Sequence, residues 1–377
     1  MPVDDRSSNP RGVVVAHAPD EHEHASEHER SSLRAFAHRL AALRGYDFGG
    51  MYEPLRRYPG HRYFVPSRTL TCEEAAVLGI RGHDDLFGGG VPHAFVATKA
   101  ISHPLLADHA ASPRGWDPGF AARAGDAVLA GYTAFEPGDA RLAGLRLLAS
   151  GPVRIKPVRA TGGHGQAVAR DAAQLQSLLA ASDPGEIAAH GLVLEEDLGE
   201  VRTVSVGQVT VADLTASYFG FQRLTRNNHG AEVFGGSDLT VVRGGWDDLL
   251  GLSPAPAIRR AIEQARRYDA AVNACFAGFF ASRINYDIAQ GLDAAGRARS
   301  GVLEQSWRVG GATGPEIAAL EVFRREAGRS QVRAAGFEIY GDGPPPPQHA
   351  IVHYRGTDPH VGRLAKYTLV DPDADPR

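Results

Sequence analysis

Lys156 lies inside a short apolar run, residues 153–157 (Val-Arg-Ile-Lys-Pro), and a glycine-rich loop, residues 161–166 (Thr-Gly-Gly-His-Gly-Gln), follows closely. The run has the length and composition of a buried strand. Lysine is rarely buried without a partner, and the backbone N–H groups of a glycine-rich loop can turn toward anionic oxygens. The segment therefore indicates an anion-binding strand and loop, and a surface lysine beside an ordinary turn is the alternative. It is not a P-loop, because G-x-x-x-x-G-K-[ST] is absent from the sequence.

The length of the chain, 377 residues, predicts two or three domains, and the content of 43% hydrophobic and 22% charged residues excludes wholesale disorder. The net charge of -4 provides no basic field, so we expect neither nucleic acid nor membrane as a partner. The N-terminus has no secretory signal, and the chain has only two cysteines, without a C-x-x-C pair. We expect a cytoplasmic protein without a disulfide framework. The oligomeric state is open, and a homodimer is one option.

The first part of the chain alternates strand and helix patterns, which predicts an N-terminal α/β domain over residues 11–95. The apolar residues between 31 and 44 recur at spacings of three and four, and Gly45 stands where a helix would end. The predicted elements are a strand at 12–18, a helix at 31–44, a strand at 61–65, a helix at 73–78 and a loop at 84–92.

The remainder is predicted to form a second domain over residues 96–330, built on an antiparallel sheet, and a C-terminal extension over residues 331–377. Four valines alternate with other residues between 202 and 214, which is typical of a half-buried strand. The predicted helices are 101–109, 139–150, 171–182, 256–280 and 316–327. The predicted strands are 153–157, 191–198, 202–214, the hairpin 282–288 with 300–305, and 350–354 after a four-proline spacer.

Two carboxylates, Asp287 and Glu304, lie on the two strands of the predicted hairpin. Adjacent antiparallel strands can bring such side chains to one place. Magnesium prefers carboxylate oxygens and keeps water and phosphate oxygens for its other positions. The pair is therefore a candidate magnesium site, and exposed hairpin charges are the alternative interpretation.

Taken in chain order, these pieces resemble the ATP-grasp superfamily, whose members are mostly carboxylate–amine or carboxylate–thiol ligases. Residues 153–165 are similar to the family's strand lysine and small-residue loop, which bind the nucleotide phosphates. Residues 193–198 (Val-Leu-Glu-Glu-Asp-Leu) are similar to its adenine hinge, and residues 199–204 (Gly-Glu-Val-Arg-Thr-Val) to the start of the next strand. The resemblance implies ATP contacts from Lys156, Gly162, Gly163, His164, Gly165, Glu195, Glu196, Leu198 and Glu200.

Residues 304–311 (Glu-Gln-Ser-Trp-Arg-Val-Gly-Gly) are similar to the family's metal strand, which reads Glu-x-Asn-x-Arg before glycines. Ser306 takes the place of the asparagine. The resemblance therefore implies one magnesium ion on Asp287 and Glu304, with Ser306 as a weak or water-mediated ligand. It also implies that Arg308 holds an oxyanion or the substrate carboxylate. By spacing and position, the family's further phosphate or substrate contacts would be Lys99, Arg226 and Asn228.

The resemblance covers residues 96–328, and the strand near residue 13 fits the small domain that precedes the grasp in this superfamily. It implies an α/β (α+β) class, namely an ATP-grasp fold with a small N-terminal α/β domain, and ATP with Mg²⁺ as cofactors. The implied activity is ATP-dependent ligation of a carboxylate, activated as an acylphosphate, to an amine or thiol, with Lys156 and Arg308 as catalytic residues. Two alternatives remain: an ATP-binding sensor or scaffold without ligation, suggested by Ser306, and a small-molecule kinase.

Overall fold

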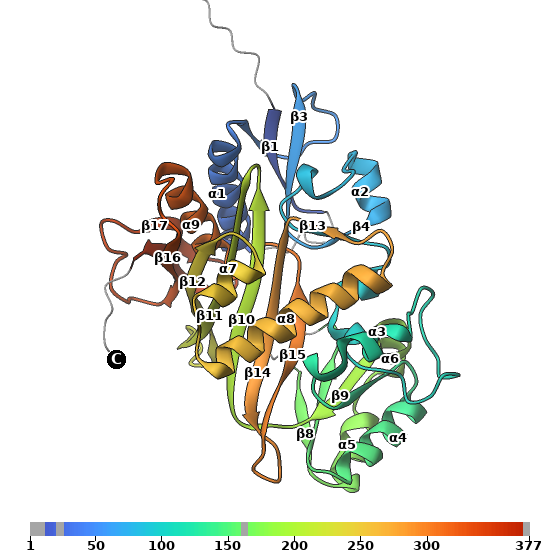
Figure 1. Cartoon of the computed structure of the whole chain (residues 1–377). Helices are drawn as coiled ribbons and strands as arrows, with labels where there is room; N and C mark the ends of the chain where they lie inside the picture. Colours follow the sequence, from blue (N-terminus) through green and yellow to red (C-terminus); the bar gives the residue numbers. More distant parts are fainter. Residues whose placement is uncertain (1–11, 20–25, 160–164, 372–377) are drawn as a thin grey trace, which may run out of the picture.

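The computed structural model of the chain describes residues 12–19, 26–159 and 165–371 (Figure 1). An eight-stranded sheet lies in the middle of the molecule, an N-terminal unit covers one end, and a four-stranded sheet with its helices lies at the other end (Figure 1). No helix in these described ranges is both long and apolar enough to span a membrane.

The N-terminal unit is a parallel sheet of order β2-β1-β3, formed by β1 (Gly12–His17), β2 (Asp47–Met51) and β3 (His61–Pro66), with α1 (Glu27–Arg44) packed on it. The predicted strands and helix are confirmed. The helix starts earlier than predicted because Ser26 and Glu29 form a capping box. The next helix, α2 (Cys72–Leu78), is also confirmed. The predicted loop at 84–92 is partly wrong, since β5 (Gly89–Val91) pairs with β4 (Leu70–Thr71) and β13 (Phe280–Ala281).

The four-stranded sheet has the order β6-β9-β7-β8 and carries the lysine strand, β7, beside the hinge strand, β9. The predicted helix at 101–109 is wrong: a 3₁₀ turn, Lys99–Ser102, ends before His103, and Pro104 favours an extended residue before it. The strands are β6 (Gly131–Ala134), β7 (Val153–Pro157), β8 (Ala167–Ala169) and β9 (Leu192–Glu196), and the nearby helices are α3 (Gly119–Ala124), α4 (Pro137–Leu148), α5 (Ala172–Ala180) and α6 (Pro184–His190).

The central sheet is antiparallel throughout, with the order β15-β14-β10-β11-β12-β16-β18-β17. Its last three strands come from residues 331–370, so the predicted separate C-terminal extension is wrong: β16 pairs directly with β12. The strands are β10 (Gly199–Val211), β11 (Leu214–Arg226), β12 (Glu232–Arg243), β14 (Arg283–Leu292), β15 (Ala298–Ser306), β16 (Gln331–Tyr340), β17 (Ile351–Asp358) and β18 (Gly362–Val370).

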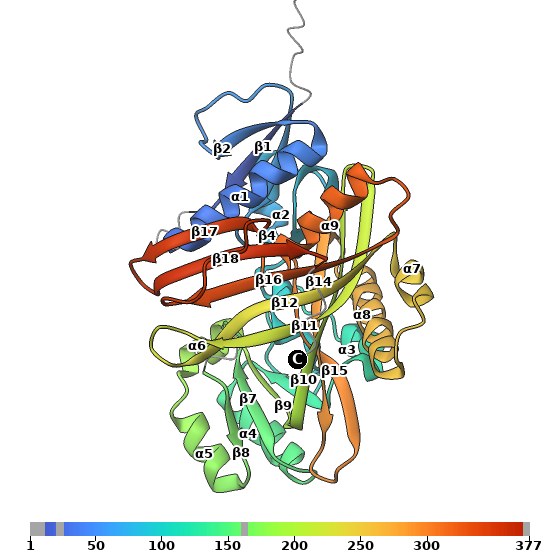
Figure 2. The same cartoon turned by 90° about the vertical axis from the view of Figure 1, so that its left-hand side faces the viewer.

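Helices cover both faces of this sheet. On one face α8 (Pro256–Cys275) packs with α7 (Trp246–Gly251) against an apolar cluster that includes Val204 and Val206. On the other face α9 (Thr313–Arg325) packs with α1 against a cluster that includes Val209 and Val211. Figure 2 shows α1 lying along β17 and β18, so the N-terminal unit is joined to the C-terminal strands.

Candidate active site

A cavity of about 350 Å³ lies between the four-stranded sheet and the central sheet. Lys156, Glu195 and Glu196 line it from β7 and β9, and Asp287 and Glu304 line it from β14 and β15. The ammonium group of the predicted phosphate strand and the two predicted metal-binding carboxylates therefore surround one space. The other lining residues are Leu129, Arg154, Gln166, Leu198, Val201, Thr203, Gln222, Ala289 and Leu303.

Lys156 is buried, and its Nζ donates to Glu195 Oε1 at 2.9 Å. The two residues lie diagonally on neighbouring antiparallel strands, where long side chains meet. His103 Nε2 lies 3.1 Å from Glu195 Oε2, so the carboxylate has a partner on each oxygen. Burial raises the pKa of Glu195, but Lys156 and His103 outweigh it and lower this pKa to about 2. The carboxylate is thus ionised and fixes the position of the ammonium group.

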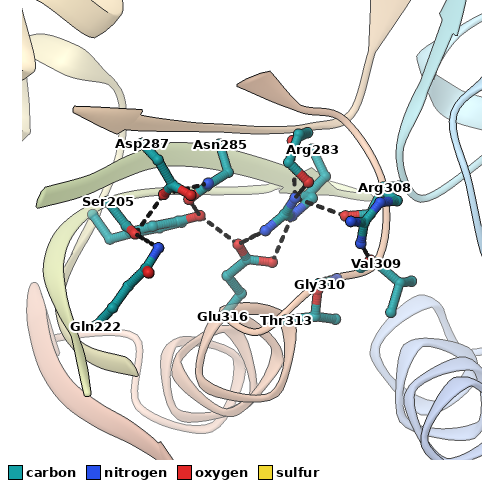
Figure 3. Close-up of polar contacts among 12 residues, drawn as sticks. Ser205, Gln222, Arg283, Asn285, Asp287, Arg308, Val309, Gly310, Thr313 and Glu316 are labelled. Carbon is teal, nitrogen blue, oxygen red and sulfur yellow. Dashed lines mark hydrogen bonds and ion pairs between the residues drawn. The ribbon is translucent and has the colours of Figure 1, made fainter. Parts of the chain in front are cut away.

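Asp287 and Glu304 are directly opposite each other on β14 and β15, and Ser205 is opposite Asp287 on β10. Ser205 Oγ donates to Asp287 Oδ1 at 2.7 Å (Figure 3), and Lys99 Nζ lies 3.1 Å from Glu304 Oε2. Burial and the neighbouring Glu304 carboxylate raise the pKa of Asp287. Two carboxylates held side by side at a partly buried edge favour a bound cation.

The donor set fits one magnesium ion. Two carboxylates face a cavity with room for water and phosphate oxygens, which is the ligand combination that magnesium prefers. Within the described ranges no third His, Cys, Asp or Glu joins a group that could hold a metal. Asp287 and Glu304 would hold the ion, and the remaining positions would fall to water and phosphate.

The lining also fits a nucleotide base at its apolar end. Leu129, Leu198, Ala289 and Leu303 form a small apolar cluster, and all four line the cavity. Leu198 belongs to the predicted hinge, in which Arg299 makes a bidentate contact with Glu196 at 2.7 and 3.1 Å. The cavity thus has an apolar end beside the hinge and a charged end between Lys156 and the carboxylates.

Neither Ser306 nor Arg308 lines this cavity. Arg308 lies next to a buried ion pair (Figure 3), and so does Ser306. Arg283 is 1% exposed, and its guanidinium contacts the Glu316 carboxylate at 2.8–3.1 Å. Arg283 Nη1 also donates to the backbone oxygens of Ser306 and Arg308 and lies 3.3 Å from Ser306 Oγ. The Ser306 hydroxyl therefore lies beside a cation, which disfavours a metal ion on it, and its role as a weak or water-mediated ligand stays a prediction.

A glycine makes room for this network. A Cβ on Gly207 of β10 would lie 2.4 Å from the Tyr218 hydroxyl. Without it, the Tyr218 hydroxyl reaches Glu316 Oε1 at 2.6 Å and Asn285 Oδ1 at 2.9 Å. Asn285 Nδ2 in turn donates to Asp287 Oδ1 at 3.2 Å. The buried ion pair is thus connected by hydrogen bonds to the carboxylate edge.

Five other predicted contacts are not among the residues that line the cavity: Lys99, Gly165, Glu200, Arg226 and Asn228. Arg226 and Asn228 lie at the exposed β11–β12 turn, where Arg226 donates to Gly230 O and Asn228 donates to the backbone oxygens of Val361 and Arg363. The hairpin turns toward β18, and the role of both residues as phosphate or substrate contacts stays a prediction. Glu200 is exposed at the start of β10. Gly165 has the left-handed φ of 68° that glycine favours, and Gly162, Gly163 and His164 lie outside the described residues.

The sequence analysis missed His103, Ser205, Gln222, Arg283 and Glu316. His103, Ser205, Gln222 and Glu316 belong to no local motif, since each reaches the site from an element far away in the chain. Arg283 lies on β14, the strand of Asp287. An available signal was the alternation in β10, which places Ser205 and Thr203 on the face opposite Val204 and Val206. His103 and Glu316 had no such signal.

Comparison with known proteins assigns the fold. Biotin carboxylase from Campylobacter jejuni, solved as a beta-gamma-ATP complex, matches with a TM-score of 0.50 and 10% identity, covering 95% of this chain and 87% of that chain. This likeness shows the predicted ATP-grasp fold. Phosphoribosylamine–glycine ligase from Thermotoga maritima matches with a TM-score of 0.49, 14% identity and coverage of 94% and 90%. N5-carboxyaminoimidazole synthetase from Staphylococcus aureus complexed with ADP matches with a TM-score of 0.48 and 12% identity, covering 96% of this chain and 94% of that chain.

The family follows from a sequence comparison. The chain belongs to the family described as "Protein of unknown function (DUF3182)", whose profile matches residues 14–368. A search of the curated proteins found no match.

Proposed function

We propose that the protein is an ATP-dependent ligase that activates a carboxylate as an acylphosphate and joins it to an amine or thiol. The observation that carries the proposal is the single cavity around Lys156, Asp287 and Glu304, with an apolar end beside the hinge. The ATP-grasp fold, which the chain shares with a biotin carboxylase solved as a beta-gamma-ATP complex, supports it.

In this proposal the base of ATP packs against Leu198 and its apolar neighbours, and the phosphates extend toward Lys156. An ammonium group has three donors, so Lys156 can keep Glu195 and still donate to a phosphate oxygen. Glu195 and His103 act as positioning residues, because Glu195 holds the ammonium group and His103 holds Glu195. Magnesium on Asp287 and Glu304 supplies charge neutralisation for the transferred phosphoryl group when it is bound.

The proposed reaction has two steps. A carboxylate oxygen of the acid attacks the γ-phosphorus, a new O–P bond forms, and ADP leaves with the electron pair of the broken P–O bond. The amine then attacks the acyl carbon, a C–N bond forms, phosphate leaves, and the nitrogen gives up one proton. Arg308, which follows Glu304 by four residues, suits bidentate contact with the acid carboxylate.

Trapping with hydroxylamine tests the proposal without knowledge of the natural amine. The protein is incubated with ATP, magnesium, hydroxylamine and a panel of carboxylic acids, and hydroxamate and ADP are measured together. We expect equal amounts of both products with an accepted acid, and neither above background without an acid. ADP formed at the same rate without any acid, or without hydroxamate, would refute the ligase.

The sensor or scaffold alternative is favoured by one observation, the Ser306 hydroxyl beside Arg283 where the superfamily has a metal-binding asparagine. In the same experiment that protein would bind ATP and form no ADP. A small-molecule kinase would instead give a phosphorylated hydroxyl compound and no hydroxamate.

A further inference from the structure

A second, larger cavity of about 630 Å³ lies where the N-terminal unit meets the central sheet. Its walls come from α1, from the segment after β3, from the turn 308–311, and from β12, β16 and β18. Its end nearest the first cavity is Arg308, which lies just past the end of β15. Glu304 of the first cavity is on β15 itself, so the two cavities share this short segment.

Arg308 contributes a guanidinium cation to the lining of this cavity. Its Nη1 donates to Val309 O at 2.7 Å, and within residues 12–19, 26–159 and 165–371 no carboxylate forms an ion pair with it. Burial and the nearby Arg283 lower the pKa of Arg308, so the guanidinium lies in an environment that disfavours its charge. Two other cations in the lining differ, since Lys366 pairs with Glu338 at 2.9 Å and Arg68 pairs with Glu74. Glu29 also lines the cavity and accepts hydrogen bonds from Ser26.

Part of the cavity lining is apolar. Leu33 and Phe36 of α1 are 3% and 7% exposed and line it together with Phe234 and Phe337. Gly311 makes this wall possible, because a Cβ there would lie 2.3 Å from the Phe234 ring. The cavity thus has one cationic end and an apolar body, which is complementary to a molecule with a single anionic group on an apolar skeleton.

Two buried hydroxyls in the lining have no partner within the described ranges. Ser32 is 7% exposed, and neither its Oγ nor the Oγ of Ser67 has a hydrogen-bond partner. Buried hydroxyls normally find a partner, because leaving one unsatisfied costs about 1–3 kcal/mol. Both line the same cavity, so they point to a ligand that carries hydrogen-bonding oxygens.

We propose that this cavity binds the acid substrate of the ligase, and that this acid is a monocarboxylate with an apolar body. The inference rests on the proposed function for the role of the acid, and on the cavity alone for its chemical class. The carboxylate meets the Arg308 guanidinium, next to the segment shared with the first cavity, and the apolar skeleton packs against Leu33 and Phe36. Helix α1 of the N-terminal unit is therefore the element that selects the acid.

Calorimetric titration of the full chain with four matched probes tests this proposal. 3-Phenylpropionate carries the charge and the apolar body, 3-phenylpropanol lacks the charge, 3-phenylpropylamine reverses it, and succinate lacks the apolar body. We expect 3-phenylpropionate to bind at least about tenfold more tightly than the other three. Arg308→Gln should remove the preference for the acid over the alcohol, a loss of about 10- to 100-fold, since hydrogen bonds to charged groups are worth about 1.5–3 kcal/mol.

Ser32→Ala serves as a milder variant should Arg308→Gln unfold the chain, and cooperative melting identifies the folded variants. Ser32→Ala should weaken the binding of 3-phenylpropionate about threefold or more, and it should not weaken the binding of 3-phenylpropylamine. Equal binding of acid and alcohol by the unaltered protein, tighter binding of succinate, or no binding of the acid overturns the proposal. An unchanged preference in both variants overturns it as well.

Separate titration with ATP and magnesium distinguishes this inference from the proposed function. The double variant Lys156→Met, Glu195→Gln should lose ATP binding and keep the binding of 3-phenylpropionate, because neither residue lines the second cavity. If the unaltered protein binds the acid and not ATP, the proposed function fails while the chemical class of this cavity stands. If the unaltered protein binds ATP and not the acid, the chemical class assigned to this cavity fails while the proposed function stands.

Discussion

The two cavities differ in how their charges are balanced. In the first, Lys156 is paired with Glu195, Lys99 with Glu304, and Arg299 with Glu196. In the second, Arg308 has no carboxylate partner in the described part of the chain, and two buried hydroxyls are unsatisfied there. A paired site is stable without its ligand, and an unpaired one gains more from binding. The paired charges therefore pre-form the first cavity for a highly charged ligand, whereas the Arg308 guanidinium of the second cavity favours an anion.

The largest expected loss of stability concerns the buried ion pair between Arg283 and Glu316. Glu316→Ala leaves the Arg283 guanidinium buried without its carboxylate, so we expect the free energy of unfolding to fall by about 3–5 kcal/mol. Denaturant titration measures this change. Arg324→Gln, which breaks the exposed pair with Asp213, is the control and should change stability by less than about 1 kcal/mol. Similar losses in the two variants would contradict a buried, structural role for the Arg283–Glu316 pair.

The next effect separates charge pairing from ligand binding in the first cavity. Lys156→Met leaves Glu195 with only His103 as a partner, and we expect a loss on the order of 3 kcal/mol. Adding Glu195→Gln removes the unpaired charge and should restore most of the stability without restoring ATP binding. A double variant that melts no higher than Lys156→Met would argue against the pairing.

The same pair predicts a pH dependence. The pKa of Glu195 is lowered in the folded protein from 4.5 to about 2, because Lys156 and His103 outweigh burial. The unfolded chain therefore binds a proton first, and this contribution to stability is complete above about pH 4.5 and is lost as the pH falls toward 2. The loss is on the order of 3 kcal/mol. Denaturant titrations between pH 6 and 3 should show a shallower decline for the double variant than for the unaltered protein.

A smaller effect tests the apolar wall of the second cavity. Gly311→Ala places a methyl group 2.3 Å from the Phe234 ring, whereas the nearest atom to a methyl group on Gly310 is 3.6 Å away. We expect Gly311→Ala to lower stability by about 1–2 kcal/mol and to weaken 3-phenylpropionate, because the ring must move into the cavity. Gly310→Ala should change stability by no more than about 0.5 kcal/mol. Equal melting temperatures for the two variants would contradict this packing.

The smallest expected change in stability is an increase. Asp287→Asn removes a charge beside Glu304, so the protein without metal should become slightly more stable, by at most about 1 kcal/mol. Stabilisation by added magnesium should disappear in this variant, as a thermal melt can show. Asp293→Asn at the exposed hairpin turn is the matched control and should keep the response to magnesium. A response that survives in Asp287→Asn would exclude this carboxylate as a ligand.

The sequence could predict the first cavity better than the second, for a physical reason. Lys156, Glu195, Asp287 and Glu304 lie on strands whose apolar patterns are visible, and strand pairing brings Lys156 to Glu195 and Asp287 to Glu304. The second cavity combines α1 with the turn 308–311 and strands β16 and β18, which meet only through tertiary packing. The β11–β12 hairpin, β16 and β18 were missed because their polar and glycine-rich patterns resemble loops, whereas the strand predicted at 350–354 overlaps β17. Arg308 was found by its motif, although its cavity was not.

Calorimetric titration of ATP in the presence of magnesium tests the central claim most directly. We expect the unaltered protein to bind one ATP, and we expect the folded Lys156→Met, Glu195→Gln protein to bind ATP about 10- to 100-fold more weakly. Equal affinity in the two proteins, or no ATP binding by the unaltered protein, would contradict the assignment of the first cavity to a nucleotide.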